Sequence, residues 1–181
     1  MTVIAVFGSA LGPWLRYDRQ AILDGEWWRL ISCHFVHLNW SHLGMNMAGF
    51  LLIWILFGRL LKTWEWLLVL LPACLMVALG LLAFDRNLLW YVGFSGVLHS
   101  IVVVACLFDL RNAHLDGKLI LLAICIKLIY EQKFGPLPGS ETTAGGKVVV
   151  DAHLYGAIAG VVLVPVIVYL RFLQSRSASP Q

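Results

Sequence analysis

The sequence predicts an all-α membrane protein in which six transmembrane helices form one compact domain over residues 1–181. Hydrophobic residues make up 60% of the chain and charged residues only 13%, and the mean hydropathy of +0.84 lies far above that of ordinary soluble domains. Six apolar runs approach the roughly 20 residues that cross about 30 Å of hydrocarbon. These runs use well over half of the chain and leave no linker or soluble domain between them.

The six predicted spans are separated by short polar segments. They cover residues of about 1–15, 43–61, 64–83, 95–110, 116–130 and 151–171. The first run is short and lacks the basic residues that begin a signal peptide, so we expect a retained helix rather than a cleaved leader. Charge leaves the orientation open, because cytoplasmic termini would put six basic residues in the inner segments and six in the outer loops.

Polar residues enter the apolar runs in three clusters. "CHFVHLNWSHLGMNM" leads into the second run, "GFSGVLHS" opens the fourth and "DAHLYGAIAG" opens the sixth. Because consecutive spans alternate in direction, these three runs all begin at the same face of the membrane. Polar groups inside a bilayer are costly, so their gathering at one face indicates a shared functional site.

The serine of the fourth run is predicted to lie below the membrane surface. Ser95 precedes Asp109, at the far boundary of that run, by fourteen residues. Fourteen helical residues span about 21 Å of roughly 30 Å of hydrocarbon, which leaves the serine some 9 Å deep. The preceding "LLWYVGF" must then enter the membrane as non-helical backbone, which is tolerated only where it lines a wet cavity or is covered by protein.

The sixth run offers a partner for this serine. His153, Gly156 and Gly160 fall on one helical stripe, and Gly96 and Ser100 repeat the small-residue spacing on the fourth run. Two helices with small faces can pack closely enough for the Ser95 hydroxyl to reach an imidazole nitrogen of His153. Such a pair is a base-activated nucleophile.

The second run supplies hydrogen-bond donors. His42 and Asn46 are four residues apart and share a helical face. Acyl transfer to a serine needs donors for the oxyanion that develops on the scissile carbonyl. The three clusters therefore combine a nucleophile, a base and oxyanion donors.

These clusters resemble the motifs of the rhomboid intramembrane serine proteases. "GFSG" resembles their G-x-S-G, "AHLYGAIAG" their A-H-x-x-G-x-x-x-G, "HLGMN" their H-x-x-x-N, and "EWWRL" the tryptophan-arginine element of their first outer loop. The four motifs occur in the family's order and cover nearly the whole chain. The resemblance implies a six-span bundle with cytoplasmic termini and an active site that opens outward.

Carried over to this chain, the resemblance implies Ser95 as nucleophile, His153 as general base and acid, and His42 and Asn46 as oxyanion donors beside the Ser95 N–H. It implies no acidic third member. Asp151 would point to the opposite face of the helix from His153, and we interpret it as the N-cap of the sixth span. The glycines expected to support helix packing at the site are Gly93, Gly96, Gly156 and Gly160.

Further details resemble the rhombosortase subfamily. These are the short core without soluble extensions, "RYDR" before "GEWWRLISCHFVHLNWSHL", and "GFSGVLH". The resemblance implies C-terminal processing of exported bacterial proteins that carry a Gly-Gly motif, a single transmembrane helix and a basic tail. It also implies a location in the inner membrane, with the active site open to the periplasm.

Other histidines and one loop accompany these motifs. We expect His34 and His37 at the pocket mouth or the membrane interface, and His99 in a hydrogen bond within the bundle. The segment 134–147, "FGPLPGSETTAGGK", is rich in turn residues, and we expect it either to gate entry together with the fifth run or to be a flexible connection.

Three alternatives to a protease remain open. A membrane metalloenzyme would use the histidines, but H-E-x-x-H is absent and we expect no metal site and no cofactor. A non-catalytic relative would bind transmembrane helices without cleaving them. A small transporter or haem-binding bundle would use His99 and His153 as ligands. The absence of a basic cluster argues against a nucleic-acid partner.

Overall fold

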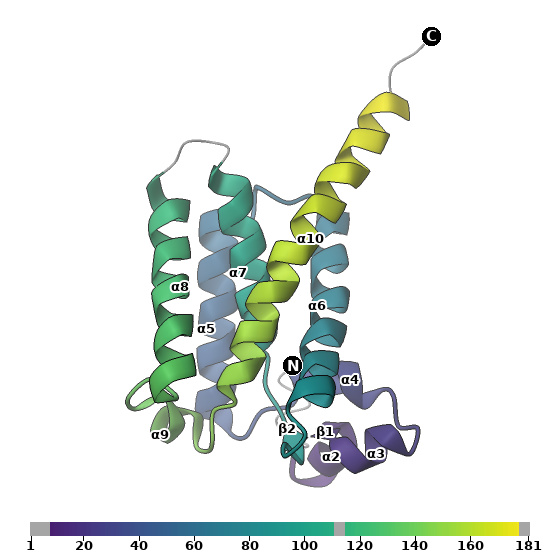
Figure 1. The fold of residues 1–181 in the computed structure, drawn as a ribbon, viewed down its shortest axis with the longest axis vertical. Coiled ribbons are helices and arrows are strands. Elements are labelled where there is room, and N and C mark those ends of the chain that lie inside the picture. Colours follow the sequence, from purple (N-terminus) through teal and green to yellow (C-terminus); the bar gives the residue numbers. More distant parts are fainter. Residues whose placement is uncertain (1–7, 111–114, 178–181) are drawn as a thin grey trace.

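The computed structural model describes residues 8–110 and 115–177, and this part of the chain is mostly helical (Figure 1). In chain order the elements are α2 (Gly8–Leu15), β1 (Tyr17–Asp18), α3 (Arg19–Leu23), α4 (Arg29–Ser32), the 3₁₀ helix η1 (Cys33–Phe35), α5 (Trp40–Phe57), α6 (Thr63–Phe84), β2 (Trp90–Tyr91), α7 (Ser95–Asp109), α8 (Leu115–Phe134), α9 (Ser140–Ala144) and α10 (Val150–Ser177). The helices α5, α6 and α10 are long and apolar enough to cross a membrane, and α7 is a shorter apolar helix.

The helix ends differ from the predicted ones for local reasons. α5 begins before residue 43, because the Asn39 side chain accepts a hydrogen bond from the His42 N–H (2.8 Å) and caps the helix. α10 begins at Val150, so the prediction that Asp151 is its N-cap is wrong. The Asp151 carboxylate instead accepts a hydrogen bond from Gln132 on α8 (3.1 Å).

The helix α7 lies at the centre of the bundle, packed against α5, α6, α8 and α10 (Figure 1). Glycines let α7 and α10 meet backbone to backbone. A Cβ added to Gly156 would overlap the carbonyl oxygen of Gly96. A Cβ on Gly160 would lie 2.7 Å from the carbonyl oxygen of Ser100. Larger residues at these positions would therefore push the two helices apart.

The segment before α5 differs from the predicted first span. Residues 1–7 of that run lie outside the described residues, and the rest of it forms the short α2. The next strand, β1, pairs antiparallel with β2, with Tyr17 opposite Tyr91 and Asp18 opposite Trp90. The all-α prediction missed this sheet, because strands of two residues are too short to produce a periodic pattern.

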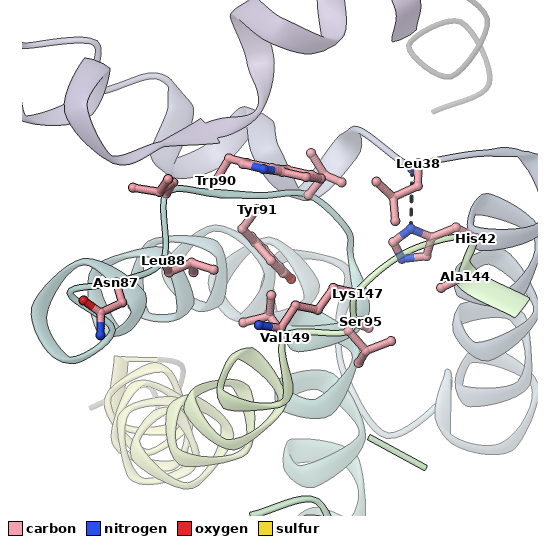
Figure 2. A pocket seen from close by; sticks show the side chains of 13 residues that line it. Leu38, His42, Asn87, Leu88, Trp90, Tyr91, Ser95, Ala144, Lys147 and Val149 are labelled. Carbon is pink, nitrogen blue, oxygen red and sulfur yellow. Dashed lines mark hydrogen bonds between the residues drawn. The ribbon is translucent and has the colours of Figure 1, made fainter. Parts of the chain in front are cut away.

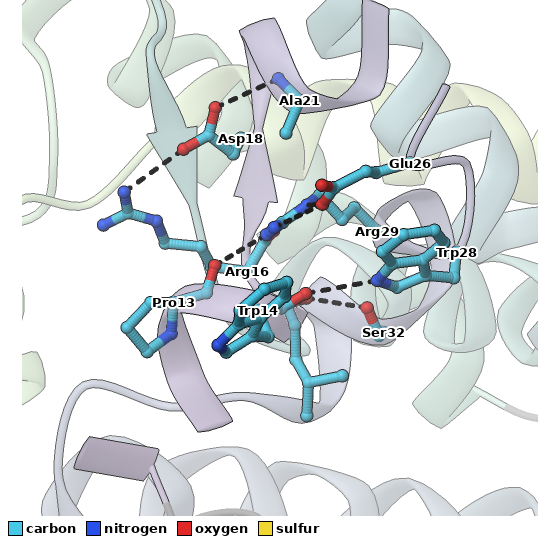
Figure 3. Close-up of polar contacts among 10 residues, drawn as sticks. Pro13, Trp14, Arg16, Asp18, Ala21, Glu26, Trp28, Arg29 and Ser32 are labelled. Atoms are coloured by element: carbon cyan, nitrogen blue, oxygen red, sulfur yellow. Dashed lines mark hydrogen bonds and ion pairs between the residues drawn. The ribbon is translucent and has the colours of Figure 1, made fainter. Parts of the chain in front are cut away.

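One arginine holds this segment together (Figure 3). Arg29 is 5% exposed, and its guanidinium donates to the carbonyl oxygens of Pro13 (2.7 Å) and Arg16 (2.9 Å) and to the Glu26 carboxylate (2.6 Å). The Trp28 indole N–H donates to the carbonyl oxygen of Trp14 (3.2 Å). The "EWWRL" motif thus ties the chain before β1 to α4.

A second ion pair joins helices at the opposite end of the bundle. Glu65, at the start of α6, is fully buried and accepts two hydrogen bonds of 2.6 Å from the Arg171 guanidinium on α10. Arg171 also donates to the carbonyl oxygen of Leu60 (2.8 Å) and lies over the Phe108 ring at the end of α7. This bidentate pair links three helices where α10 leaves the bundle.

Candidate active site

The site begins where an extended segment turns into α7. After β2 the chain passes through Gly93, whose φ of +124° is rarely adopted by residues with a side chain, and α7 begins at Ser95. The Gly93 N–H donates to the carbonyl oxygen of Cys33 (3.1 Å), and its own carbonyl oxygen accepts from the Tyr91 hydroxyl (2.8 Å). These bonds hold the turn that presents Ser95 at the first position of the helix.

Ser95 and His153 come together across the contact between α7 and α10. The Ser95 Oγ lies 3.0 Å from the His153 Nε2. His153 is 6% exposed, and Ser95 is partly exposed. Their distance follows from the close packing of the two helices, because a Cβ on Gly96 would lie 2.7 Å from the carbonyl oxygen of Ala152, next to His153.

The opposite nitrogen of His153 meets two charged residues of α8. The His153 Nδ1 lies 2.9 Å from the Glu131 Oε2 and 3.2 Å from the Lys127 Nζ. Glu131 and Lys127 form an ion pair of 2.6 Å, and the Glu131 side chain is 2% exposed. The resemblance implied no acidic third member, and the structure places the Glu131 carboxylate against the His153 Nδ1.

The sequence contains a signal for this carboxylate in the fifth apolar run and the residue that follows it. Lys127 and Glu131 are four residues apart in "KLIYE", so they share a face of α8. Ionisable residues in or beside a membrane span indicate a functional site by default. The predicted fifth span ended at residue 130, whereas α8 continues to Phe134 and includes both charges.

His99 covers one face of the His153 ring. The two rings are stacked with centroids 4.4 Å apart and an interplanar angle of 20°. The His99 Nδ1 lies 2.7 Å from the carbonyl oxygen of Ser95, which can only accept, so this nitrogen carries the proton. His99 thus makes a hydrogen bond within the bundle to the Ser95 backbone and not to its hydroxyl.

The predicted oxyanion donors lie on α5. The His42 ring borders the turn at Gly93, where an added Cβ would lie 2.9 Å from the His42 Nε2. The Leu38 N–H donates to the His42 Nδ1 at 3.5 Å, which leaves the Nε2 as the protonated nitrogen. Asn46 is 5% exposed, and its side-chain nitrogen has no hydrogen-bond partner among the described residues. Both side chains retain donor capacity.

His34 and His37 are buried, contrary to the expectation that they lie at the pocket mouth or the interface. His34 is fully buried, its Nε2 lies 2.9 Å from the carbonyl oxygen of Cys74, and its Nδ1 lies 3.3 Å from the carbonyl oxygen of Gly93. Burial lowers the pKa of His34 to about 4, so the ring is neutral near pH 7. His37 is 6% exposed and packs edge-on against the His42 ring at 5.1 Å.

A cavity of about 260 Å³ opens beside Ser95 (Figure 2). The segment from Asn87 to Val92 forms one wall, with Leu38 and His42 on another and the residues before α10 on a third. The segment 134–147 contributes Ala144 and Lys147 to the lining, and α9 lies within this segment. The lining is mostly apolar, and its polar side chains are His42, Asn87, Trp90, Tyr91, Ser95 and Lys147.

Comparison with known protein families matches residues 24–170 to the rhomboid domain. This match includes every helix from α4 to α9, the site residues described above and most of α10. A comparison with curated proteins finds no match.

Proposed function

The chain belongs to the rhomboid family, and from this premise we propose that Ser95 and His153 are the nucleophile and the general base of an intramembrane serine protease. Membership implies an integral membrane protein whose substrates are transmembrane proteins. The observation that carries the proposal is the 3.0 Å contact between the Ser95 Oγ and the His153 Nε2 beside a cavity.

The reaction proceeds in two steps. Ser95 Oγ attacks the scissile carbonyl carbon while its proton passes to His153 Nε2, and His153 then gives that proton to the leaving amine. Water hydrolyses the acyl-serine in the second step, with His153 again acting as the base. The Ser95 N–H, His42 and Asn46 donate to the oxyanion in both steps, and losing one such donor typically slows a reaction by about 10²–10³.

The substrate reaches Ser95 as an extended segment. A transmembrane helix has its carbonyls in internal hydrogen bonds, so it must unwind locally before a peptide bond can be attacked. Residues such as Gly-Gly favour this unwinding. The segment 134–147 lines the cavity and would gate entry together with α8.

The finer assignment is a rhombosortase-like protease of the bacterial inner membrane. A site open to the periplasm and a cytoplasmic C-terminus belong to this proposal, whereas α2 is too short to be the predicted first span. Its substrates are exported proteins with a C-terminal Gly-Gly motif, a single transmembrane helix and a basic tail. The sequence details "RYDR" and "GFSGVLH" support it.

A fluorophosphonate probe tests the proposed nucleophile without a known substrate. We expect covalent labelling of the wild type in detergent or nanodiscs, and none in Ser95→Ala or His153→Ala. Ser100→Ala is a matched control, because Ser100 is a buried serine on the same helix whose hydroxyl has no hydrogen-bond partner among the described residues. Absence of labelling in well-folded wild type would instead favour a non-catalytic binder of transmembrane helices.

Co-expression tests the substrate class. A Gly-Gly-tailed membrane protein is produced with wild type, Ser95→Ala or His153→Ala, and the new C-terminus is measured by mass spectrometry. We expect a truncated product with the wild type alone. An unchanged cleavage pattern in both variants would refute the protease assignment, and chelator-sensitive cleavage that survives Ser95→Ala would favour a metalloenzyme.

A further inference from the structure

The charged pair on α8 has no part in the reaction described above, yet it touches the proposed base. Glu131 is the most buried carboxylate at this end of the bundle among the described residues, with a side chain 2% exposed. Its Oε2 lies 2.9 Å from His153 Nδ1, the ring nitrogen that faces away from Ser95. At this position the Glu131 carboxylate can influence Ser95 only through the His153 imidazole.

Hydrogen-bond chemistry assigns the proton between the two groups. A carboxylate has only acceptor atoms, so a contact of 2.9 Å with His153 Nδ1 requires that this nitrogen carry the hydrogen. If the His153 Nδ1 instead accepted a hydrogen bond from Lys127, it would carry a lone pair and no hydrogen. Nδ1 and the Glu131 oxygen would then both be acceptors, and they would repel each other. The coherent arrangement has both His153 Nδ1–H and Lys127 donating to Glu131.

This arrangement leaves His153 ready to act as a base. With the proton on Nδ1, the neutral ring has its lone pair on Nε2, and this nitrogen lies 3.0 Å from the Ser95 Oγ. We propose that Glu131, paired with Lys127, is a positioning residue that holds His153 in this tautomer and ring orientation. The inference rests on the proposed function of Ser95 and His153.

Lys127 and His99 complete the surroundings of the His153 ring. An unpaired carboxylate buried at this depth would be costly, and the Lys127 ammonium at 2.6 Å supplies the compensating charge. His99 stacks on the ring face and restricts its rotation. When Ser95 transfers its proton to Nε2, the imidazolium keeps its Nδ1–H bond to Glu131, and no proton moves to the carboxylate.

Asp151 does not take this role, although it lies two residues before His153. Its Oδ1 accepts from Gln132 at 3.1 Å, on the outer side of the contact between α8 and α10. The side chain is partly exposed, whereas that of Glu131 is enclosed. The carboxylate nearest in sequence is therefore not the one that orients the histidine.

Labelling kinetics with the fluorophosphonate test the inference on full-length protein in nanodiscs. We expect Glu131→Gln to lower the maximal labelling rate roughly 10- to 100-fold with little change in the probe concentration for half-maximal rate. Glu131→Asp should recover part of the rate, because it restores the charge at a slightly greater distance. Asp116→Asn is the matched control on the same helix, because Asp116 is exposed at the opposite end.

Nitrogen NMR of the wild type gives a second readout that does not depend on a folded variant. With ¹⁵N-labelled histidine, assigned by comparison with His153→Gln, we expect a protonated Nδ1 and an unprotonated Nε2 on His153. A protonated Nε2 in the wild type, or Glu131→Gln labelled within twofold of the wild type, would overturn the inference. Labelling that persists in Ser95→Ala would instead remove the proposed function on which it rests.

Discussion

At the scale of single residues, the site depends on Gly93, and two independent features of the structure require a glycine at this position. Gly93 adopts φ +124°, which strains any residue with a side chain. It also lies against the His42 ring. The turn that presents Ser95 and the position of a proposed oxyanion donor are therefore coupled through this residue.

Gly93→Ala should damage activity more than folding. Its Cβ would lie 2.8 Å from the His42 Cε1, so the ring must move away from the oxyanion position. We expect a loss of about 10²-fold or more in protease activity, the magnitude typical of losing one donor. Cleavage or probe labelling, read beside the melting temperature, measures this difference.

Gly25→Ala is the control for backbone strain. Gly25 also has a positive φ, of +107°, but the nearest atom to an added Cβ is the Trp27 Nε1 at 3.9 Å, an ordinary contact distance. It should cost stability through backbone strain and leave the rate unchanged. Equal losses of activity in the two variants would show that strain, and not the contact with His42, explains the effect.

At the scale of elements, the ends of α6 and α10 bring two carboxyl groups together. Asp85 caps the C-terminus of α6, and Asp151 lies in the first turn of α10. Burial and the neighbouring Asp151 carboxylate raise the pKa of Asp85 to about 6, while Arg19 and Tyr155 act in the opposite direction. We therefore expect the stability of this junction to depend on pH.

Asp85→Asn should stabilise the protein more at high pH than at low pH. Because the pKa of Asp85 is higher in the folded state than in the unfolded chain, its ionisation opposes folding as the pH rises from about 4 through 6. We expect the melting temperature of the variant to exceed that of the wild type by on the order of 2 °C at pH 8, and by less at pH 5.

Thermal unfolding in detergent at the two pH values checks this expectation. Asp24→Asn serves as the comparison, because Asp24 is an exposed carboxylate outside the junction. A gain in melting temperature at pH 5 that equals the gain at pH 8 would contradict the electrostatic explanation. It would point to a packing effect of the amide.

At the scale of the whole molecule, the proposed active site and the buried ion pair lie at opposite ends of the bundle. The ends of α7 and α10 at the site, together with β2 and α9, gather at one end (Figure 1). The opposite end holds the buried pair of Glu65 and Arg171. This pair fixes α10 at the end of the bundle that lies away from the site, so the proposed catalytic geometry does not depend on the pair directly. At the site end, α8 and the segment 134–147 determine the surroundings of α10.

The proposed orientation predicts which end faces outward. In intact bacterial cells, Thr142→Cys should react with a membrane-impermeant maleimide, whereas Arg59→Cys should react only after permeabilisation. Thr142 is exposed in α9 at the site end, and Arg59 is exposed after α5 at the opposite end. The parent chain is the control, since Cys33, Cys74 and Cys106 are buried and only Cys125 is exposed among the native cysteines. The reverse labelling pattern would show that the site end faces the cytoplasm.

The sequence by itself determined the helical membrane class and the residues of the motifs. Hydropathy and helical periodicity are local properties, so the runs that became α5, α6, α7, α8 and α10 could be located within a few residues. The spacing within "HLGMN", "GFSG" and "AHLYGAIAG" indicated the proposed nucleophile, base and donors, because these residues share faces within single helices.

Only the tertiary structure decided which side chains meet across helices. Glu131 lies 22 residues before His153 on another helix, and their contact depends on the rotation and closeness of α8 and α10. The stacking of His99, the burial of His34 and the pairing of β1 with β2 have the same origin. Packing fixes helix rotation through many long-range contacts, and no local pattern in one sequence encodes them.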